Sequence, residues 1–128
     1  MHVLIARKIT LHSGCLMDLE HDLRKLNCGE VDASALARDT YQHDASVFTV
    51  RPEAVVFPRS TADVCEIVRY AESHPGVALT PRGGGTDMSG GAVGGSVVLD
   101  MTRHFNRLIS VTPDTHTHGR AGYAAVQP

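Results

Sequence analysis

The sequence has no tryptophan, few other aromatic residues and only three cysteines among its 128 residues. Cys15, Cys28 and Cys65 are scattered, so they form neither a CxxC metal motif nor the even-numbered framework of a disulfide-stabilised domain. No apolar run approaches the roughly 18 residues that a membrane-spanning helix needs. We therefore expect free thiols in a cytoplasmic protein without a transmembrane segment.

An excess of charge of one sign is also missing, because the formal net charge is -2. Proteins that bind nucleic acid usually present a basic surface, so nucleic acid is not expected as a partner. The length suits one domain, or part of one, with a single hydrophobic core.

The centre of the chain predicts a strand, a helix and a second strand in that order. The run EAVVF lies between two prolines and predicts a strand over 53–57. Apolar residues at helical spacing predict a helix over 59–74, with Ser60 as its N-cap. The run VALT predicts the second strand over 77–80. Such a unit places both strands in one parallel sheet, with the helix over one face.

Glycine is concentrated directly after the second of these strands. Seven of the twelve glycines fall between Gly83 and Gly95. The loop leaves the carboxyl end of a parallel strand, where α/β sheets usually bind ligands. A third strand is predicted over 96–101 with no helix before it, so neither a dinucleotide-binding turn nor a P-loop fits. Successive glycines allow backbone N–H groups to converge on an anion such as a phosphate, and a flexible surface connection is the alternative.

The amino-terminal part of the sequence has a helical pattern. Leucines at helical spacing predict a helix over 15–26. A second helix is predicted over 31–44, with Asp32 or Ser34 as its cap. These segments predict a helical leader over 1–50, followed by the main domain over 51–128.

The carboxyl-terminal part alternates weakly between apolar and polar residues. Segments 105–111 and 121–127 predict an antiparallel hairpin with its turn at Pro113-Asp114. The predicted fold class is α+β, a βαβ lobe followed by the start of a mainly antiparallel lobe. His116 and His118 have a spacing that suits a metal ligand pair, but solvent-facing histidines beside a turn are the more common case.

Several segments together resemble a known family. The lead-in YQHDASVF, the strand and cap VVFPRSTADV, the loop PRGGGT and the segment LDMTRHFNRL occur in that order between about residues 41 and 128. The sequence resembles the start of the PCMH-type FAD-binding domain of the vanillyl-alcohol oxidase / p-cresol methylhydroxylase flavoproteins. The resemblance is closest to glycolate oxidase FAD subunits, D-lactate dehydrogenases and D-2-hydroxyglutarate dehydrogenases.

The resemblance implies a cofactor site in the glycine loop. The residues that it implies for binding the FAD pyrophosphate, mostly through backbone N–H groups, are Arg82, Gly83, Gly84, Gly85, Thr86, Asp87, Ser89 and Gly90. Some branches attach FAD to a histidine of this loop, and none is present here, so non-covalent FAD is expected. Asp87 departs from relatives that carry Ser or Asn, and we expect its carboxylate to turn away and bond its own turn. Gly91 stands where relatives often have Gln.

The resemblance also implies an activity, the oxidation of a D-2-hydroxy acid by hydride transfer to FAD. The alternative is a non-catalytic remnant or interaction module that keeps the fold without flavin. A third hypothesis is a phosphate- or nucleotide-binding domain unrelated to flavins. We expect the chain to be an amino-terminal fragment whose partner is the rest of the FAD and substrate domains. No catalytic residue is therefore assigned. The full-length protein would be cytoplasmic or peripheral to the inner membrane.

Overall fold

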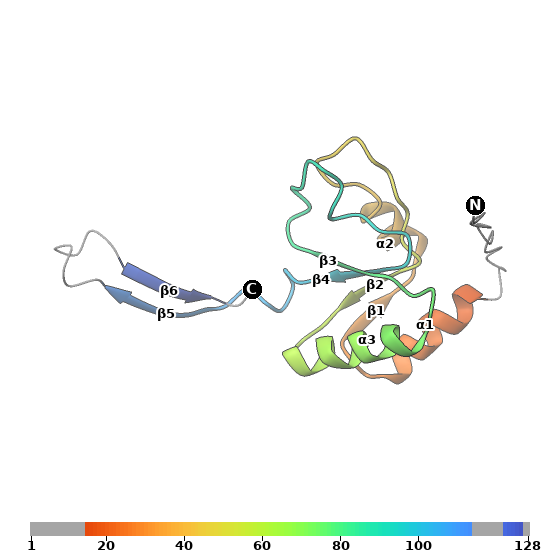
Figure 1. The fold of residues 1–128 in the computed structure, drawn as a ribbon, viewed down its shortest axis with the longest axis horizontal. Coiled ribbons are helices and arrows are strands. Elements are labelled where there is room, and N and C mark those ends of the chain that lie inside the picture. Colours follow the sequence, from red (N-terminus) through yellow and green to blue (C-terminus); the bar gives the residue numbers. More distant parts are fainter. Residues whose placement is uncertain (1–14, 114–121, 127–128) are drawn as a thin grey trace, which may run out of the picture.

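The computed structural model describes residues 15–113 and 122–126. The helices are α1 (Cys15–Lys25), α2 (Ala35–Thr40) and α3 (Thr61–Ser73). The strands are β1 (Glu30–Asp32), β2 (Ala54–Phe57), β3 (Leu79–Arg82), β4 (Val97–Asp100), β5 (Leu108–Pro113) and β6 (Gly122–Val126). These elements form an α/β body and a separate two-stranded hairpin (Figure 1).

Four strands make the sheet of the body, in the order β1-β2-β4-β3. β4 is parallel to both β2 and β3, whereas β1 is antiparallel to β2. The predicted strands β2 and β3 do lie in one parallel sheet, but β4 is inserted between them. β2 and β4 are buried along their whole length, as expected of central strands. β3 contains Pro81, which lacks an N–H, and this strand lies at the edge.

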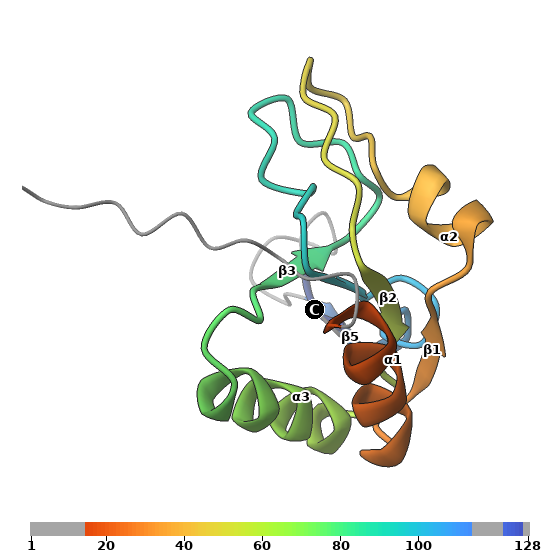
Figure 2. The same cartoon turned by 90° about the vertical axis from the view of Figure 1, so that its right-hand side faces the viewer.

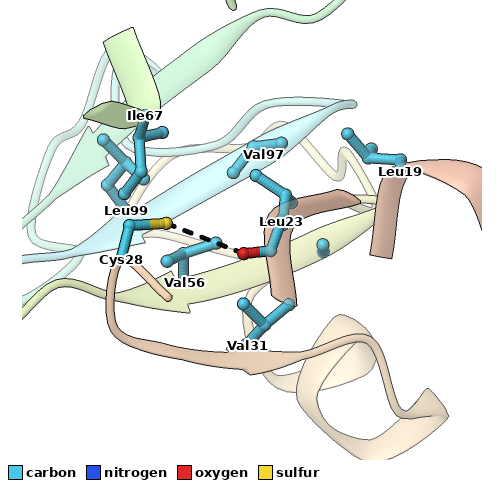
Figure 3. Close-up of a cluster of buried hydrophobic side chains, with 9 residues drawn as sticks. Leu19, Leu23, Cys28, Val31, Val56, Ile67, Val97 and Leu99 are labelled. Carbon is cyan, nitrogen blue, oxygen red and sulfur yellow. Dashed lines mark hydrogen bonds between the residues drawn. The ribbon is translucent and has the colours of Figure 1, made fainter. Parts of the chain in front are cut away.

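Helices cover both faces of the sheet. α1 and α3 lie on one face, and α2 lies on the other (Figure 2). On the first face, Leu23 and Ile67 are fully buried against Val56 and Leu99 (Figure 3). On the second face, Val55 and other residues of β2 pack against α2. The alternation of neighbouring residues in β2 between the two faces is the period of two that a strand imposes.

The helix caps follow the predicted chemistry. The Ser60 hydroxyl accepts a hydrogen bond from Asp63 N–H at 3.2 Å and begins α3. Ser34 rather than Asp32 caps α2, and its hydroxyl accepts from Ala37 N–H at 3.2 Å. Asp32 instead accepts from Ser34 N–H at 2.9 Å. The prediction of a helix starting at residue 31 was wrong, because the chain first forms β1 and α2 then begins at Ala35.

The amino-terminal part contributes to the core of the sheet. Leu19, Leu23 and Val31 join one cluster with residues of β2 and β4. Cys28 is buried in the same cluster, where burial raises the pKa of its thiol, and its Sγ lies 3.8 Å from the Leu23 carbonyl oxygen (Figure 3). Residues before and after position 50 therefore share one hydrophobic core. The division of the chain at that position stays a prediction.

The hairpin of β5 and β6 extends away from the body (Figure 1). Its strands are antiparallel, as predicted, with Thr112 opposite Tyr123. The apolar side chains of the hairpin are more than half exposed; they are Leu108, Ile109, Val111, Tyr123 and Val126. The predicted turn lies largely outside the described residues, as do His116 and His118. No helix in the described part of the chain is long and apolar enough to cross a membrane.

Candidate functional site

The predicted site residues lie together in one loop. The glycine loop, defined here as residues 83–96, joins β3 to β4 and contains no helix, as predicted. It starts at the carboxyl end of β3, where Arg82 is aligned with Asp100 of β4. Met101 N–H donates to the Arg82 carbonyl at 2.9 Å and fixes this edge of the sheet. The loop thus begins at the sheet edge that usually carries ligands in α/β folds.

A second segment, residues 41–53, runs beside the glycine loop (Figures 1 and 2). Ala45 N–H donates to the Gly85 carbonyl at 3.0 Å, and Ala92 N–H lies 3.4 Å from the Asp44 carboxylate. Phe48 contacts Gly90, where the backbone φ of +87° suits glycine and a Cβ would lie 2.6 Å from the ring. Our site prediction omitted this segment. Its lead-in YQHDASVF, one of the segments that carry the family resemblance, was the available signal.

The Arg82 side chain lies beneath the loop. Its Nη1 is 3.4 Å from the Tyr41 carbonyl oxygen and 3.3 Å from that of Ala92, and its guanidinium lies 5.1 Å from the centre of the Tyr41 ring. A Cβ at Gly85 would lie 2.4 Å from Arg82 Nη2, and the Gly85 φ is +68°. The backbone conformation and the position of Arg82 therefore favour glycine at position 85. Arg82 brings a positive charge to the underside of the loop.

Tyr41 also contacts the sheet edge through its hydroxyl, which donates to the Asp100 carboxylate. Asp100 is only 6% exposed and also accepts from Thr102 N–H and Oγ1, both at 2.7 Å, and from Arg103 N–H at 3.2 Å. Burial opposes ionisation of Asp100, but these hydrogen bonds outweigh it, and the pKa of Asp100 is lowered. Burial and the bond to Asp100 raise the pKa of Tyr41 to about 12. At neutral pH, Tyr41 is a donor and Asp100 an anion.

The two glycines at the start of the loop have no such internal role. A Cβ at Gly83 would have no heavy atom within 4 Å, and one at Gly84 would meet only the Thr86 methyl group at 3.8 Å. Within the described residues, no acceptor contacts the backbone N–H groups from Gly83 to Met88. The start of the loop therefore offers open space beside a row of free donors, which suits a phosphate group that approaches the backbone closely.

Asp87 bonds its own turn, as predicted. Its Oδ1 accepts from Ser89 N–H and Ser89 Oγ, both at 2.7 Å, and its Oδ2 accepts from Gly91 N–H at 3.0 Å. The hydroxyl of Ser89 and then its N–H lower the pKa of Asp87, so this carboxyl is ionised at neutral pH. These bonds also occupy the donors of Ser89, which was expected to contribute to the cofactor site.

No cluster of three side chains that could bind a metal ion occurs among the described residues.

Comparison with known proteins identifies the family of this chain. A family model described as an FAD binding domain matches residues 52–128. The chain belongs to this FAD-binding domain family. The α+β fold class, the predicted resemblance to PCMH-type flavoproteins and FAD as the family's cofactor are thereby confirmed.

Relatives of this FAD-binding domain include two bacterial oxidoreductases. The D-2-hydroxyglutarate dehydrogenase of Escherichia coli K12 is 44% identical over 88 residues, which cover 67% of this chain and 9% of that protein. The glycolate oxidase subunit GlcD of Bacillus subtilis 168 is 33% identical over 101 residues, which cover 76% of this chain and 20% of that subunit. The FAD-binding domain described here thus spans between about a tenth and a fifth of these relatives' lengths.

A solved structure confirms the fold. The 4-ethylphenol oxidase of Gulosibacter chungangensis matches with a TM-score of 0.67 at 23% identity, over 81% of this chain and 21% of that one. At this level of identity the match concerns the fold alone. It supports the interpretation of the α/β body and hairpin as part of a PCMH-type FAD-binding domain.

Proposed function

We propose that this chain binds the pyrophosphate of non-covalent FAD in a flavin-dependent oxidoreductase that oxidises a D-2-hydroxy acid. The observation that carries the proposal is the open space at Gly83 and Gly84. The fold of the described residues does not require glycine there, whereas a pyrophosphate lying against the backbone would. The substrate class is supported by similarity to a D-2-hydroxyglutarate dehydrogenase, a glycolate oxidase subunit and a D-lactate dehydrogenase.

The residues of the loop would bind and orient the cofactor. The N–H groups from Gly83 onward supply neutral donors at close range, the Thr86 hydroxyl adds another, and the Arg82 guanidinium supplies positive charge from below. The bound flavin supplies the hydride acceptor. No histidine or cysteine lies between residues 83 and 96, which supports non-covalent attachment.

Groups that recognise and activate the substrate would come from a further part of the FAD and substrate domains. Two observations support this partner. The chain spans only 9% of its Escherichia coli relative, and the β5–β6 hairpin exposes apolar side chains on both strands. A two-stranded hairpin is marginal in water without a further strand or a covering layer. A location in the cytoplasm, or peripheral to the inner membrane in the full-length protein, stays a prediction.

The first experiment is an FAD titration of the purified chain, followed by flavin fluorescence and by the thermal unfolding midpoint. Wild-type protein should bind FAD saturably and gain thermal stability with it. Gly84→Val should leave the unfolding midpoint of the free protein unchanged. Its affinity for FAD should fall at least tenfold, because the valine side chain would fill the space proposed for the phosphate.

Gly95→Ala is the matched control, since a Cβ there makes only an ordinary contact with Val50 at 3.7 Å. It should bind FAD like the wild type. Equal FAD affinity of Gly84→Val and wild type would show that the loop is not part of the cofactor site. No saturable binding by the wild type would favour the alternative function, a module that keeps the fold without flavin.

A further inference from the structure

Asp87, the acidic residue of the glycine loop, accepts hydrogen bonds from other residues of the same loop. The Asp87 carboxylate accepts three hydrogen bonds, from Ser89 N–H, Ser89 Oγ and Gly91 N–H. Two of these donors are backbone N–H groups that converge on one anion. This is the arrangement by which a loop of this kind binds a phosphate oxygen. In this chain, the anion in that position is a carboxylate of the loop itself.

Gly91 permits this arrangement by having no side chain. A Cβ at position 91 would lie 2.3 Å from Asp87 Oδ2, which is too close for any side chain unless the carboxylate moves. No positive φ is found at Gly91, so space and not backbone conformation explains the glycine. A side chain at position 91 and the observed position of the Asp87 carboxylate therefore exclude each other.

The N–H groups of residues 83–88 consequently differ from those of Ser89 and Gly91. From Gly83 to Met88 the backbone N–H groups have no acceptor among the described residues. At Ser89 and Gly91 the N–H groups are already bonded to an ionised carboxylate. A pyrophosphate that bound the N–H groups of Ser89 and Gly91 would have to displace the Asp87 carboxylate. It would still lie beside the negative charge of that carboxylate.

We propose that Asp87 is an internal anion that occupies the N–H groups of Ser89 and Gly91 and confines the pyrophosphate to the N–H groups of residues 83–88. The inference rests on the proposed function and makes it more specific. The N–H groups of Ser89 and Gly91 lie outside the site, and Asp87 sets the boundary of the site through its carboxylate, while its own N–H belongs to the open stretch of residues 83–88.

The test is a map of backbone amide shifts in the ¹⁵N-labelled chain during titration with FAD. Amides of Gly83, Gly84 and Gly85 should shift with FAD, while those of Ser89 and Gly91 should keep their positions. Equal shifts at Ser89 and Gly91 would overturn the inference and leave the cofactor assignment intact. A titration that moves no amide at all would remove the cofactor assignment and this inference with it.

A charge variant tests the role of Asp87 directly. In D87N the loop loses its negative charge and the acceptor for Gly91 N–H, so FAD should bind about threefold tighter or more. Ser89 and Gly91 amides should then join the residues that shift. Glu72→Gln is the control, because it removes one negative charge from an exposed position of α3 outside the loop. Unchanged affinity in D87N, with unchanged shifts, would contradict the inference.

A second variant keeps the inference testable if D87N disturbs the loop. Ser89→Ala removes only a hydroxyl that donates to Asp87. Its FAD affinity should stay within about twofold of the wild type, since Ser89 does not touch the pyrophosphate. A tenfold loss would place the Ser89 hydroxyl on the cofactor and overturn the inference.

Discussion

Tyr41 and Asp100, which are 59 positions apart, are joined by a hydrogen bond from the phenol hydroxyl to the carboxylate. This bond ties the end of α2 to the carboxyl end of β4. The Tyr41 carbonyl oxygen and ring also contact Arg82 beneath the glycine loop. One tyrosine thus connects the buried edge of the sheet with the loop that we assign to the cofactor.

Removal of that hydroxyl should destabilise the fold. Tyr41→Phe keeps the ring over Arg82 but leaves a buried carboxylate of Asp100 with one donor fewer, which costs about 1–3 kcal/mol in the free energy of unfolding. Urea denaturation measures this loss. Tyr123→Phe is the control, because Tyr123 is 75% exposed and its change should have no measurable effect. Equal stability of both variants would show that the bond contributes nothing.

Acid should weaken the fold through Asp100. Its pKa is lowered in the folded protein from the ordinary value of 3.8, so the unfolded chain takes up the proton more readily. The stability that Asp100 contributes is therefore present above about pH 5 and is lost as the pH falls through 3.8 toward the lower folded value. Urea midpoints between pH 7 and pH 3 should fall in the wild type. In Asp100→Asn the fall should be smaller, and an identical pH profile would contradict this assignment.

Gly84 and Gly85 should respond differently to the same substitution. Gly85→Ala places a Cβ on a residue with φ of +68° and against the Arg82 guanidinium, so it should cost about 1–2 kcal/mol of stability. Gly84→Ala should leave stability unchanged, because its Cβ meets only a methyl group at 3.8 Å. Thermal and urea unfolding of the two variants make the comparison. Destabilisation by Gly84→Ala alone would refute the distinction between the two glycines.

Packing of α3 against the sheet should depend mainly on one buried residue. Ile67 is fully buried against β2 and β4, so Ile67→Ala should lower the free energy of unfolding by about 2–5 kcal/mol. Val68, its neighbour on α3, is 49% exposed, and Val68→Ala should change stability by less than about 0.5 kcal/mol. Urea denaturation at neutral pH measures both. A similar loss in the two variants would contradict the packing of α3 described here.

Local chemistry was predictable from the sequence. Ser60 caps α3 and Asp87 bonds its own turn because both interactions join residues at most four positions apart. β2 could be predicted from its apolar run between two prolines, and the hairpin from its alternation. The glycine loop could be located for the same reason, since its composition and the strands around it are local features.

Contacts between distant segments were not predictable. β1 has only three residues, which is too few to show a period of two, so its segment was assigned to a helix. The insertion of β4 between β2 and β3 depends on pairing between segments that are far apart in the sequence. The residues of β4 do not indicate which strands lie beside it. The contact of Tyr41 with Asp100 and Arg82 depends on this arrangement, so the residues around Tyr41 could not predict it.

The position of β4 also sets the order in which the chain can assemble. β4 is the last strand of the sheet in the sequence, and it alone bonds to both β2 and β3. During synthesis, β2 and β3 emerge earlier and have no parallel neighbour until residues 97–100 arrive. The glycine loop joins β3 to β4, so the pairing that completes the sheet also holds the two ends of this loop together.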